Sequence, residues 1–257
     1  MRIGQIKLKY TRNPYHFILP KYVEVNDQVI IKTSNGQEIG CVQQIKDDVE
    51  KQQGIHHIDR KMNEHDLTLQ KQISIKENEI KQYIYNSIKT LQLNMKLIQI
   101  HLSFDQTYLL VEYESEQRID FRELVKLISS THHVRTEMKQ IGPRDIARIK
   151  GGIGPCGLIL CCSSFIGEFE AISIKMAKNQ SLSLNPQNIS GLCGKLLCCI
   201  KYEDETYSYL KKNMPAYGST FKSEYGEGKV VDINYISQKV KIKHNDGNIE
   251  WFTLKRN

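Results

Sequence analysis

The 257-residue sequence predicts an α+β fold. It has a ferredoxin-like βαββαβ centre with a long helix, small barrel-like β segments at both termini, and a glycine- and cysteine-rich loop region. Three patterns predict this fold. Apolar and polar residues alternate near both ends, apolar residues recur with helical periodicity over residues 62–95, and strand and helix patterns follow that run. The expected segments are an N-terminal β segment (1–38), a ferredoxin-like region (39–141), a cysteine-rich region (142–217) and a C-terminal β segment (218–257).

The N-terminal β segment is predicted from alternation and from one turn signal. Residues Ile3 to Leu8 alternate apolar and polar side chains, and two further runs, 29–32 and 38–42, flank Asn35-Gly36. Asn-Gly between two such runs is a strong signal for a two-residue hairpin, because both central residues of that turn need positive φ. We therefore expect a hairpin here.

The C-terminal β segment follows the same pattern. Residues 229–233 and 239–243 are expected strands, and Asp246-Gly247 turns the chain into a third strand at 249–254. The strands of the two termini form either one small barrel shared between both ends or two separate ones.

A long helix is predicted between the terminal segments. Apolar residues recur at steps of three, four and seven from Met62 to Met95. A continuous helix over this stretch is roughly 50 Å long at ~1.5 Å per residue. It either extends in part toward a partner or bends along its own sheet.

The ferredoxin-like centre follows from the order of elements around that helix. Strand patterns at 97–104 and 108–114 come after it, and a further strand is expected at 134–138. With a strand near 40–45 before the long helix and a second helix before 134, the order is β-α-β-β-α-β. That order is the ferredoxin-like arrangement.

The second helix is expected to begin at Asp120. Asp120 with Glu123 forms the sequence signature of a capping box. In such a box the side chain of each residue accepts a hydrogen bond from the backbone N–H of the other. Behind this pair, Phe121, Leu124 and Ile128 line one helical face.

Composition bounds the class of protein. Charged residues make up 25% of the chain and the net charge is +7, which permits an anionic partner without identifying one. No run approaches the ~18 apolar residues of a membrane span, and the first residues lack an apolar signal core. We therefore expect no membrane insertion and a cytoplasmic location, where stable disulfides are rare.

Six of the seven cysteines form two copies of one motif, G-x-C-G-x-x-L-C-C. The first copy spans residues 154–162 and the second spans 191–199, which is 37 positions later. Clustered thiols in a reducing compartment indicate metal or redox chemistry, and the absence of a C-x-x-C pair argues against a thioredoxin-type site. Cys41 stands alone in an expected strand and is predicted to lie in the core.

The number of thiols suggests an incomplete site. Each copy contains C-x₄-C with no histidine between residues 151 and 200, and all-thiolate ligation favours zinc or an iron–sulfur cluster. Six thiolates are two more than one four-ligand site needs and two fewer than two such sites need. Two clusters would take three ligands from each copy, so we hypothesise that a partner chain supplies the missing ones.

The adjacent cysteines leave an alternative open. Neighbouring side chains in extended backbone point in opposite directions. One member of each pair, Cys161-Cys162 and Cys198-Cys199, is therefore a candidate core residue rather than a ligand.

Four segments around the motif read GGIGPCG (151–157), SIKMAK (173–178), SLSLNP (181–186) and ISGLCG (189–194). Together they resemble the YaaT/RicT family of bacterial proteins, which carry a conserved C-terminal region named for yeast polymerase suppressors. The resemblance covers about residues 142–217. Leu158-Ile159 departs from it, because a basic residue and a proline are expected there.

The resemblance implies a regulatory subunit rather than an enzyme. Family members form a ternary complex with two small helical proteins, RicA and RicF, which carries 4Fe–4S clusters and acts with the endoribonuclease RNase Y in the maturation of operon transcripts. Loss of that complex is associated with defects in sporulation, competence and biofilm formation. The cluster ligands come from more than one subunit. The candidate ligands in this chain are Cys156, Cys161, Cys162, Cys193, Cys198 and Cys199.

A second class of function stays open from the sequence. The chain can be an RNA-binding module with a structural zinc site, in which basic residues of the cysteine-rich region and the terminal β segments contact phosphates. A coloured, iron-containing protein would favour the first class, and a colourless, zinc-containing protein would favour the second.

Overall fold

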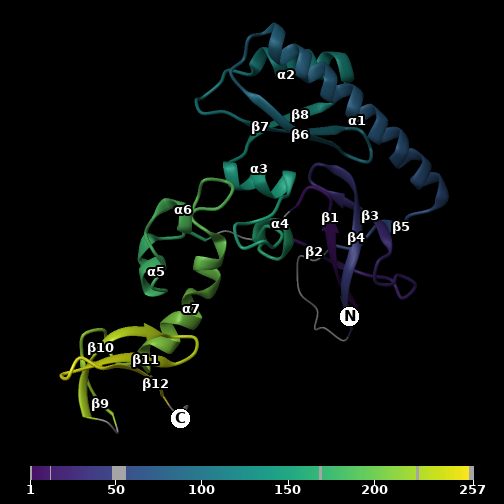
Figure 1. The fold of residues 1–257 in the computed structure, drawn as a ribbon. Coiled ribbons are helices and arrows are strands. Elements are labelled where there is room, and N and C mark those ends of the chain that lie inside the picture. Colours follow the sequence, from purple (N-terminus) through teal and green to yellow (C-terminus); the bar gives the residue numbers. More distant parts are fainter. Residues whose placement is uncertain (1, 12, 48–55, 168–169, 224–225, 255–257) are drawn as a thin grey trace. The chain divides into compact units, whose positions relative to one another are not determined.

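A computed structural model describes the chain except for residues 1, 12, 48–55, 168–169, 224–225 and 255–257. By its internal contacts it divides into two compact units, Met1–Ile146 and Ala147–Asn257 (Figure 1). Each unit contains both helices and strands, so the α+β class is confirmed. No helix among the described residues is long and apolar enough to cross a membrane.

The first unit begins with an antiparallel sheet. In the described residues its order is β2-β1-β4-β3-β5. The strands are β1 (Ile3–Leu8), β2 (Tyr15–Ile18), β3 (Gln28–Thr33), β4 (Gly36–Lys46) and β5 (Arg60–Lys61). The expected hairpin joins β3 to β4, but its two turn residues are Ser34 and Asn35 rather than Asn35 and Gly36. Gly36 pairs with Thr33 as the first residue of β4 and has a positive φ of 115°, whereas Asn35 does not have positive φ.

The second part of this unit is a sheet of order β6-β7-β8 covered by two helices. Its elements are α1 (Glu64–Thr90), β6 (Lys96–Leu102), β7 (Tyr108–Glu114), α2 (Arg122–His132) and β8 (Arg135–Gln140). β6 and β7 are antiparallel, whereas β7 and β8 are parallel. Both helices lie on one side of the sheet (Figure 1).

The ferredoxin-like arrangement is not confirmed, because β4 belongs to the other sheet. β4 pairs with β1 along one edge and with β3 along the other, so neither edge is open to the sheet of β6. Within the described ranges, the sheet beside α1 therefore has three strands instead of four. The boundary expected between residues 38 and 39 falls inside β4.

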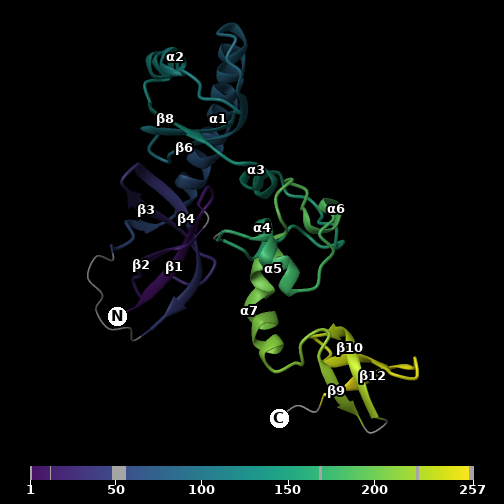
Figure 2. The same cartoon turned by 90° about the vertical axis from the view of Figure 1, so that its left-hand side faces the viewer.

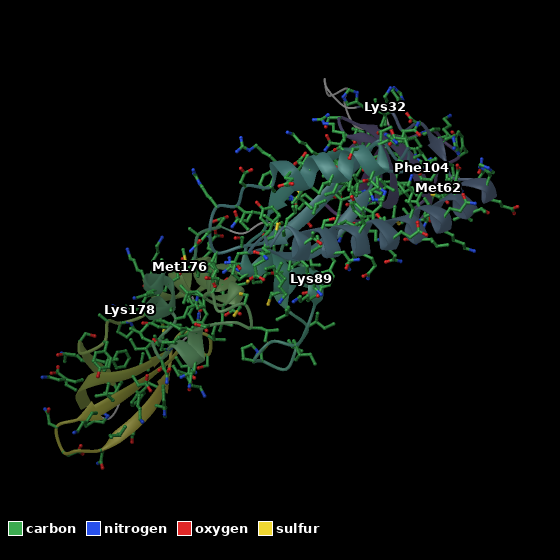
Figure 3. All side chains as sticks on the ribbon, turned by 90° about the horizontal axis from the view of Figure 1, so that it is seen from above. Lys32, Met62, Lys89, Phe104, Met176 and Lys178 are labelled. Atoms are coloured by element: carbon green, nitrogen blue, oxygen red, sulfur yellow. The ribbon has the colours of Figure 1, made fainter. Side chains whose placement is uncertain are left out.

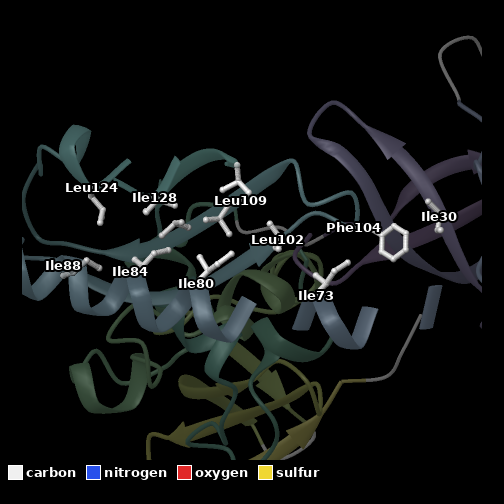
Figure 4. Packing of buried hydrophobic residues seen from close by; sticks show 12 residues of the cluster. Ile30, Ile73, Ile80, Ile84, Ile88, Leu102, Phe104, Leu109, Leu124 and Ile128 are labelled. Atoms are coloured by element: carbon white, nitrogen blue, oxygen red, sulfur yellow. The ribbon is translucent and has the colours of Figure 1, made fainter. Parts of the chain in front are cut away.

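Two cores meet at β3. Val29 and Ile31 pack in the core of the first sheet, whereas Ile30 packs with Phe104 in the core that contains α1 (Figure 4). Successive side chains of a strand point to opposite faces, so a run of three apolar residues buries both faces of β3. The backbone N–H of Phe104 donates to the carbonyl of Gln37 at 2.8 Å, which further ties the two parts together.

Helix α1 lies along its own sheet, as the second of the two expected alternatives states. Its 27 residues span about 40 Å at ~1.5 Å per residue. Ile73, Ile80, Ile84 and Ile88 form the buried stripe and point toward residues of β6, β7 and α2 (Figure 4). The helix is shorter than the periodic stretch, because it ends at Thr90 before the strand that begins at Lys96.

The expected capping box at Asp120 is wrong. The N-cap of α2 is Phe121, and it makes no side-chain cap hydrogen bond. The Asp120 carboxylate instead accepts from the Arg122 backbone N–H at 3.1 Å and forms an ion pair with the Arg122 guanidinium. A complete capping box occurs at α1, where Asn63 and Asp66 each accept from the other's backbone N–H at 2.9 Å.

The second unit contains short helices followed by a four-stranded sheet, within the part of the chain described. Helix α3 (Pro143–Lys150) spans the boundary between units. The other elements are α4 (Cys161–Ser164), α5 (Ile174–Asn179), α6 (Pro186–Ile189), α7 (Cys198–Lys212), β9 (Thr220–Ser223), β10 (Gly226–Asn234), β11 (Lys239–His244) and β12 (Ile249–Thr253). The sheet has the order β12-β11-β10-β9. Its strands β9, β10 and β12 are labelled in Figure 2. The two termini therefore form separate sheets.

Replacing Ile84 by alanine should destabilise the first unit. Ile84 is fully buried in the α1 core, so Ile84→Ala should lower the free energy of unfolding by about 2–5 kcal/mol. Urea unfolding followed by circular dichroism measures this. The matched control is Ile75→Ala on the same helix, whose side chain is 62% exposed and whose effect should stay within about 0.5 kcal/mol. Equal effects of the two substitutions would contradict the burial of this stripe.

Candidate metal centre

The two copies of the cysteine motif fold into the same structure. We call residues 152–164 hairpin C1 and residues 189–201 hairpin C2. In C1 the backbone N–H of Gly154 donates to Leu158 at 2.8 Å, and that of Leu160 donates to Gly152 at 3.2 Å. Each bond recurs 37 residues later in C2, from Gly191 to Lys195 at 2.9 Å and from Leu197 to Ile189 at 2.9 Å. The repeat in sequence is thus also a repeat in backbone hydrogen bonding.

The glycine after the first cysteine of each copy makes the turn. Gly157 has a φ of 80° and Gly194 a φ of 71°, a region where a side chain is strained. The N–H of each of these glycines donates to the glycine three residues earlier, at 3.0 Å and 2.9 Å. The motif needs glycine here because the turn must reverse the chain within a few residues.

The first glycine of each copy lies beneath the first thiol. A Cβ added to Gly154 would come within 3.4 Å of the Cys156 Sγ, and one added to Gly191 within 3.9 Å of the Cys193 Sγ. Both sulfurs therefore lie close to backbone that carries no side chain, an arrangement in which a bound atom can approach the sulfur and the backbone together.

The adjacent cysteines begin helices. Cys161 and Cys162 open α4, and Cys198 and Cys199 open α7. They are therefore not in extended backbone, and the expectation that each pair points to opposite faces is wrong. Side chains one residue apart in a helix differ by about 100° in direction, so both members of a pair can face one region.

Burial separates the six candidates. Cys156 is exposed, Cys162 is buried, and the other four are intermediate. Cys162 is thus the member of the first pair that corresponds to the expected core residue. In the second pair neither cysteine is fully buried, so burial does not exclude either one.

The two hairpins meet through α4 and α7. Phe165 after α4 and Tyr202 in α7 stand 37 positions apart, and their rings contact edge to face with centroids 5.0 Å apart. A residue that contacts its own counterpart is typical of two-fold symmetry. The motif therefore extends three residues farther than expected, to G-x-C-G-x-x-L-C-C-x-x-aromatic. The aromatic residue at the same position in both copies was the available sequence signal.

The Cys161 thiolate acts electrostatically on Cys199, and these two cysteines lie in α4 and α7, which contact each other. Burial raises the pKa of Cys199, and the negative charge of the Cys161 thiolate and of Glu203 raises it further, while backbone N–H groups at the start of α7 act in the opposite direction. Thiolates that repel each other in this way are the groups that a bound cation brings together.

A small core supports hairpin C2. Ala177 of α5, Ile189 and Ile200 are buried together, and Met176 packs against them while Lys178 on the same helix is exposed (Figure 3). The buried side chain of Gln180 donates to the carbonyl of Ile200 at 2.5 Å. Because so few apolar residues are involved, the hairpin hydrogen bonds provide much of the order here.

Large apolar side chains are exposed around both hairpins. Ile153, Leu158 and Ile159 in C1 and Leu192 in C2 are 66–70% exposed. An apolar cluster of this kind beside a ligand set is typical of a surface that another chain covers.

The described residues do not hold a complete metal site. Within these ranges, no three side chains of His, Cys, Asp or Glu lie close enough together to bind a metal ion. The donor set of the two hairpins is all thiol, so its chemistry fits zinc or an iron–sulfur cluster. Cys41 lies in β4 of the other unit, half buried, and takes no part in either hairpin.

Comparisons with known proteins match two parts of the chain. The family described as "PSP1 C-terminal conserved region" matches residues 56–141, and that described as "PSP1-like protein, third domain" matches residues 171–214. The first range covers α1, α2 and their sheet. It precedes residues 142–217, over which the motifs of the sequence resemble the YaaT/RicT family. The second range contains the cysteines of hairpin C2.

These two matches identify a PSP1-type protein. The chain belongs to the PSP1-like family that includes YaaT. It is 44% identical over 151 residues to "Stage 0 sporulation protein YaaT" of Bacillus subtilis (strain 168). The matched part is 59% of this chain and 55% of that relative, so the comparison takes in little more than half of the relative's length.

Removing one thiol should lower the pKa of the other. In Cys161→Ser the repulsion from the Cys161 thiolate is lost, so the pKa of Cys199 should fall toward its ordinary value while burial and Glu203 keep it above that value. The rate of iodoacetamide alkylation at Cys199, followed against pH by peptide mass spectrometry, measures this. Cys156→Ser is the matched control and should leave the profile unchanged. An equal shift in both variants would show that the charge of Cys161 does not raise the pKa of Cys199.

Proposed function

We propose that this chain is a regulatory adaptor subunit that holds a 4Fe–4S cluster jointly with partner subunits. The proposed partners are RicA-like and RicF-like small helical proteins. The complex would act with RNase Y in mRNA processing and influence sporulation, competence or biofilm development. In this role the chain is not an enzyme and supplies thiol ligands and a docking surface.

One observation carries the proposal. Two hairpins of identical hydrogen bonding present cysteines from the turn and from the start of a helix, yet the described chain gathers no three of these donors. A site with preformed halves and too few ligands is completed most simply by ligands from another chain. The exposed apolar residues around the hairpins give such a chain a surface to cover.

The ligands would come from both hairpins. Cys156 and Cys193 stand in the turns, and Cys161, Cys198 and Cys199 stand at the helix starts with partial exposure. Cys162 is the weakest of the six candidates because it is buried. When bound, the cluster would link the two hairpins to the partner and offset the repulsion between the Cys161 and Cys199 thiolates.

The relative's name supports a developmental role. YaaT of Bacillus subtilis is described as a stage 0 sporulation protein, and the matched 151 residues are 44% identical. We therefore propose that loss of this chain delays sporulation in its own organism and alters transcripts that RNase Y processes. A strain that lacks the gene, compared with one that carries it with Cys161→Ser and Cys199→Ser, tests whether the thiols are needed for either effect.

Metal content of the purified complex separates the proposal from its alternative. We expect the chain, co-expressed with RicA-like and RicF-like proteins and purified without oxygen, to be coloured and to contain iron and sulfide. The chain purified alone should contain little of either. Cys161→Ser or Cys199→Ser should reduce the iron content of the complex several-fold, because each removes one ligand of a shared site. Cys41→Ser, which alters a cysteine of the other unit, is the matched control.

Two outcomes would overturn the proposal. Full iron and sulfide in the isolated chain would show that no partner ligand is needed. A colourless complex that contains zinc would instead favour the RNA-binding module with a structural zinc site.

A further inference from the structure

The outer face of the C-terminal sheet is a row of lysines. Lys239, Lys241 and Lys243 alternate along β11 with the buried residues Val240 and Ile242, so all three lysines project from the same face. Alternate residues of a strand are about 7 Å apart, so the row places three positive charges along a straight line. Lys239 and Lys243 are exposed, and Lys241 is half buried.

A fourth lysine is paired with this row. Lys229 of β10 lies directly opposite Lys243 in the antiparallel register, and both are exposed. Like charges directly opposite each other destabilise a sheet. A bound anion between Lys229 and Lys243 would remove that repulsion, so the pairing indicates an anionic ligand.

An exposed aromatic ring lies beside the lysines. Trp251 of β12 is opposite Lys241, is 49% exposed, and has its ring centroid 5.7 Å from the Lys241 ammonium. Ile249 lies two residues earlier on the same face and is also exposed. The opposite face of the sheet holds the apolar core, in which Phe221 and Phe252 have ring centroids 6.2 Å apart.

Few carboxylates compensate the lysines on this face. Among the described strands of the sheet, Asp232 lies opposite Lys241, and Glu227 forms an ion pair with Lys222 at 2.9 Å. Glu250 of β12 lies opposite Ile242, in register with the other face. Lys229, Lys239 and Lys243 are therefore left with net positive charge around them.

We infer that this face, Lys229–Lys239–Lys241–Lys243–Trp251, binds single-stranded RNA. A line of lysines follows a phosphate backbone, and an exposed aromatic ring stacks on a base of any sequence. The combination favours a single strand over a duplex, because paired bases do not offer a face to the ring. The inference is independent of the cysteine hairpins and concerns a surface that the proposed adaptor function does not use.

Trp251 is the one tryptophan of the chain, so its fluorescence reports on this face alone. We expect titration of the full chain with an oligouridylate of about 10 nucleotides to quench that fluorescence saturably. With three to four phosphate contacts, the logarithm of the binding constant should fall against that of the salt concentration with a slope of about −2 to −3. A duplex RNA of the same length should bind more weakly.

Variants assign the contacts. By filter binding, Lys243→Gln should weaken the complex and reduce the magnitude of the salt slope by about 0.7. Trp251→Ala should weaken binding roughly 10-fold, because a stacked base is lost, while Trp251→Phe should retain part of it. Lys222→Gln is the matched control, since Lys222 lies in β9 of the same sheet and is already paired with Glu227. Circular dichroism of each variant checks the fold.

Three results would overturn the inference. The first is no quenching of Trp251 fluorescence by the oligouridylate at low salt, and the second is an equal loss of RNA binding in Lys222→Gln and Lys243→Gln. The third is a polyglutamate peptide that binds as tightly as the oligouridylate or more tightly, which would indicate an acidic protein as the partner. Binding that persists in Cys161→Ser would show that the surface acts independently of the hairpins, so failure of the cluster proposal would leave it standing.

Discussion

The order of the cysteine-rich region depends on one set of interactions, the backbone hydrogen bonds that close hairpins C1 and C2. The nearby core contains few buried residues, namely Ala177, Ile189 and Ile200, so apolar burial contributes little there. Each hairpin reverses the chain at a glycine with positive φ and then begins a helix at two adjacent cysteines. The same short-range bonds therefore decide where all six thiols stand.

The repeat makes the site symmetric in backbone and asymmetric in its thiols. Phe165 contacts Tyr202, its own counterpart, as a two-fold relation requires. Yet the thiol whose charge acts on Cys199, the second member of its pair, is Cys161, the first member of the other pair. Hairpin C1 is also more exposed to solvent than hairpin C2, because Cys156 and three apolar residues of C1 are exposed. A partner that covers the hairpins would thus meet two different halves.

The three regions of the chain differ in what stabilises them, and this matches their proposed roles. The first unit has extensive cores that tie two sheets together through β3. The hairpins rely on local hydrogen bonds and keep their thiols accessible. The C-terminal sheet buries one face and leaves a lysine row and a tryptophan on the other. A stable scaffold, an incomplete ligand set and a charged surface are suited to an adaptor that joins several molecules.

The sequence by itself determined the local features of this protein. It specified most strands, the hairpin between β3 and β4, the apolar stripe of α1 and the doubled motif, because periodicity and turn chemistry act over a few residues. Only the tertiary structure decided the pairing of β4 with β1 and the electrostatic effect of Cys161 on Cys199. These depend on contacts between residues far apart in the chain, and such contacts leave no periodic pattern in the sequence.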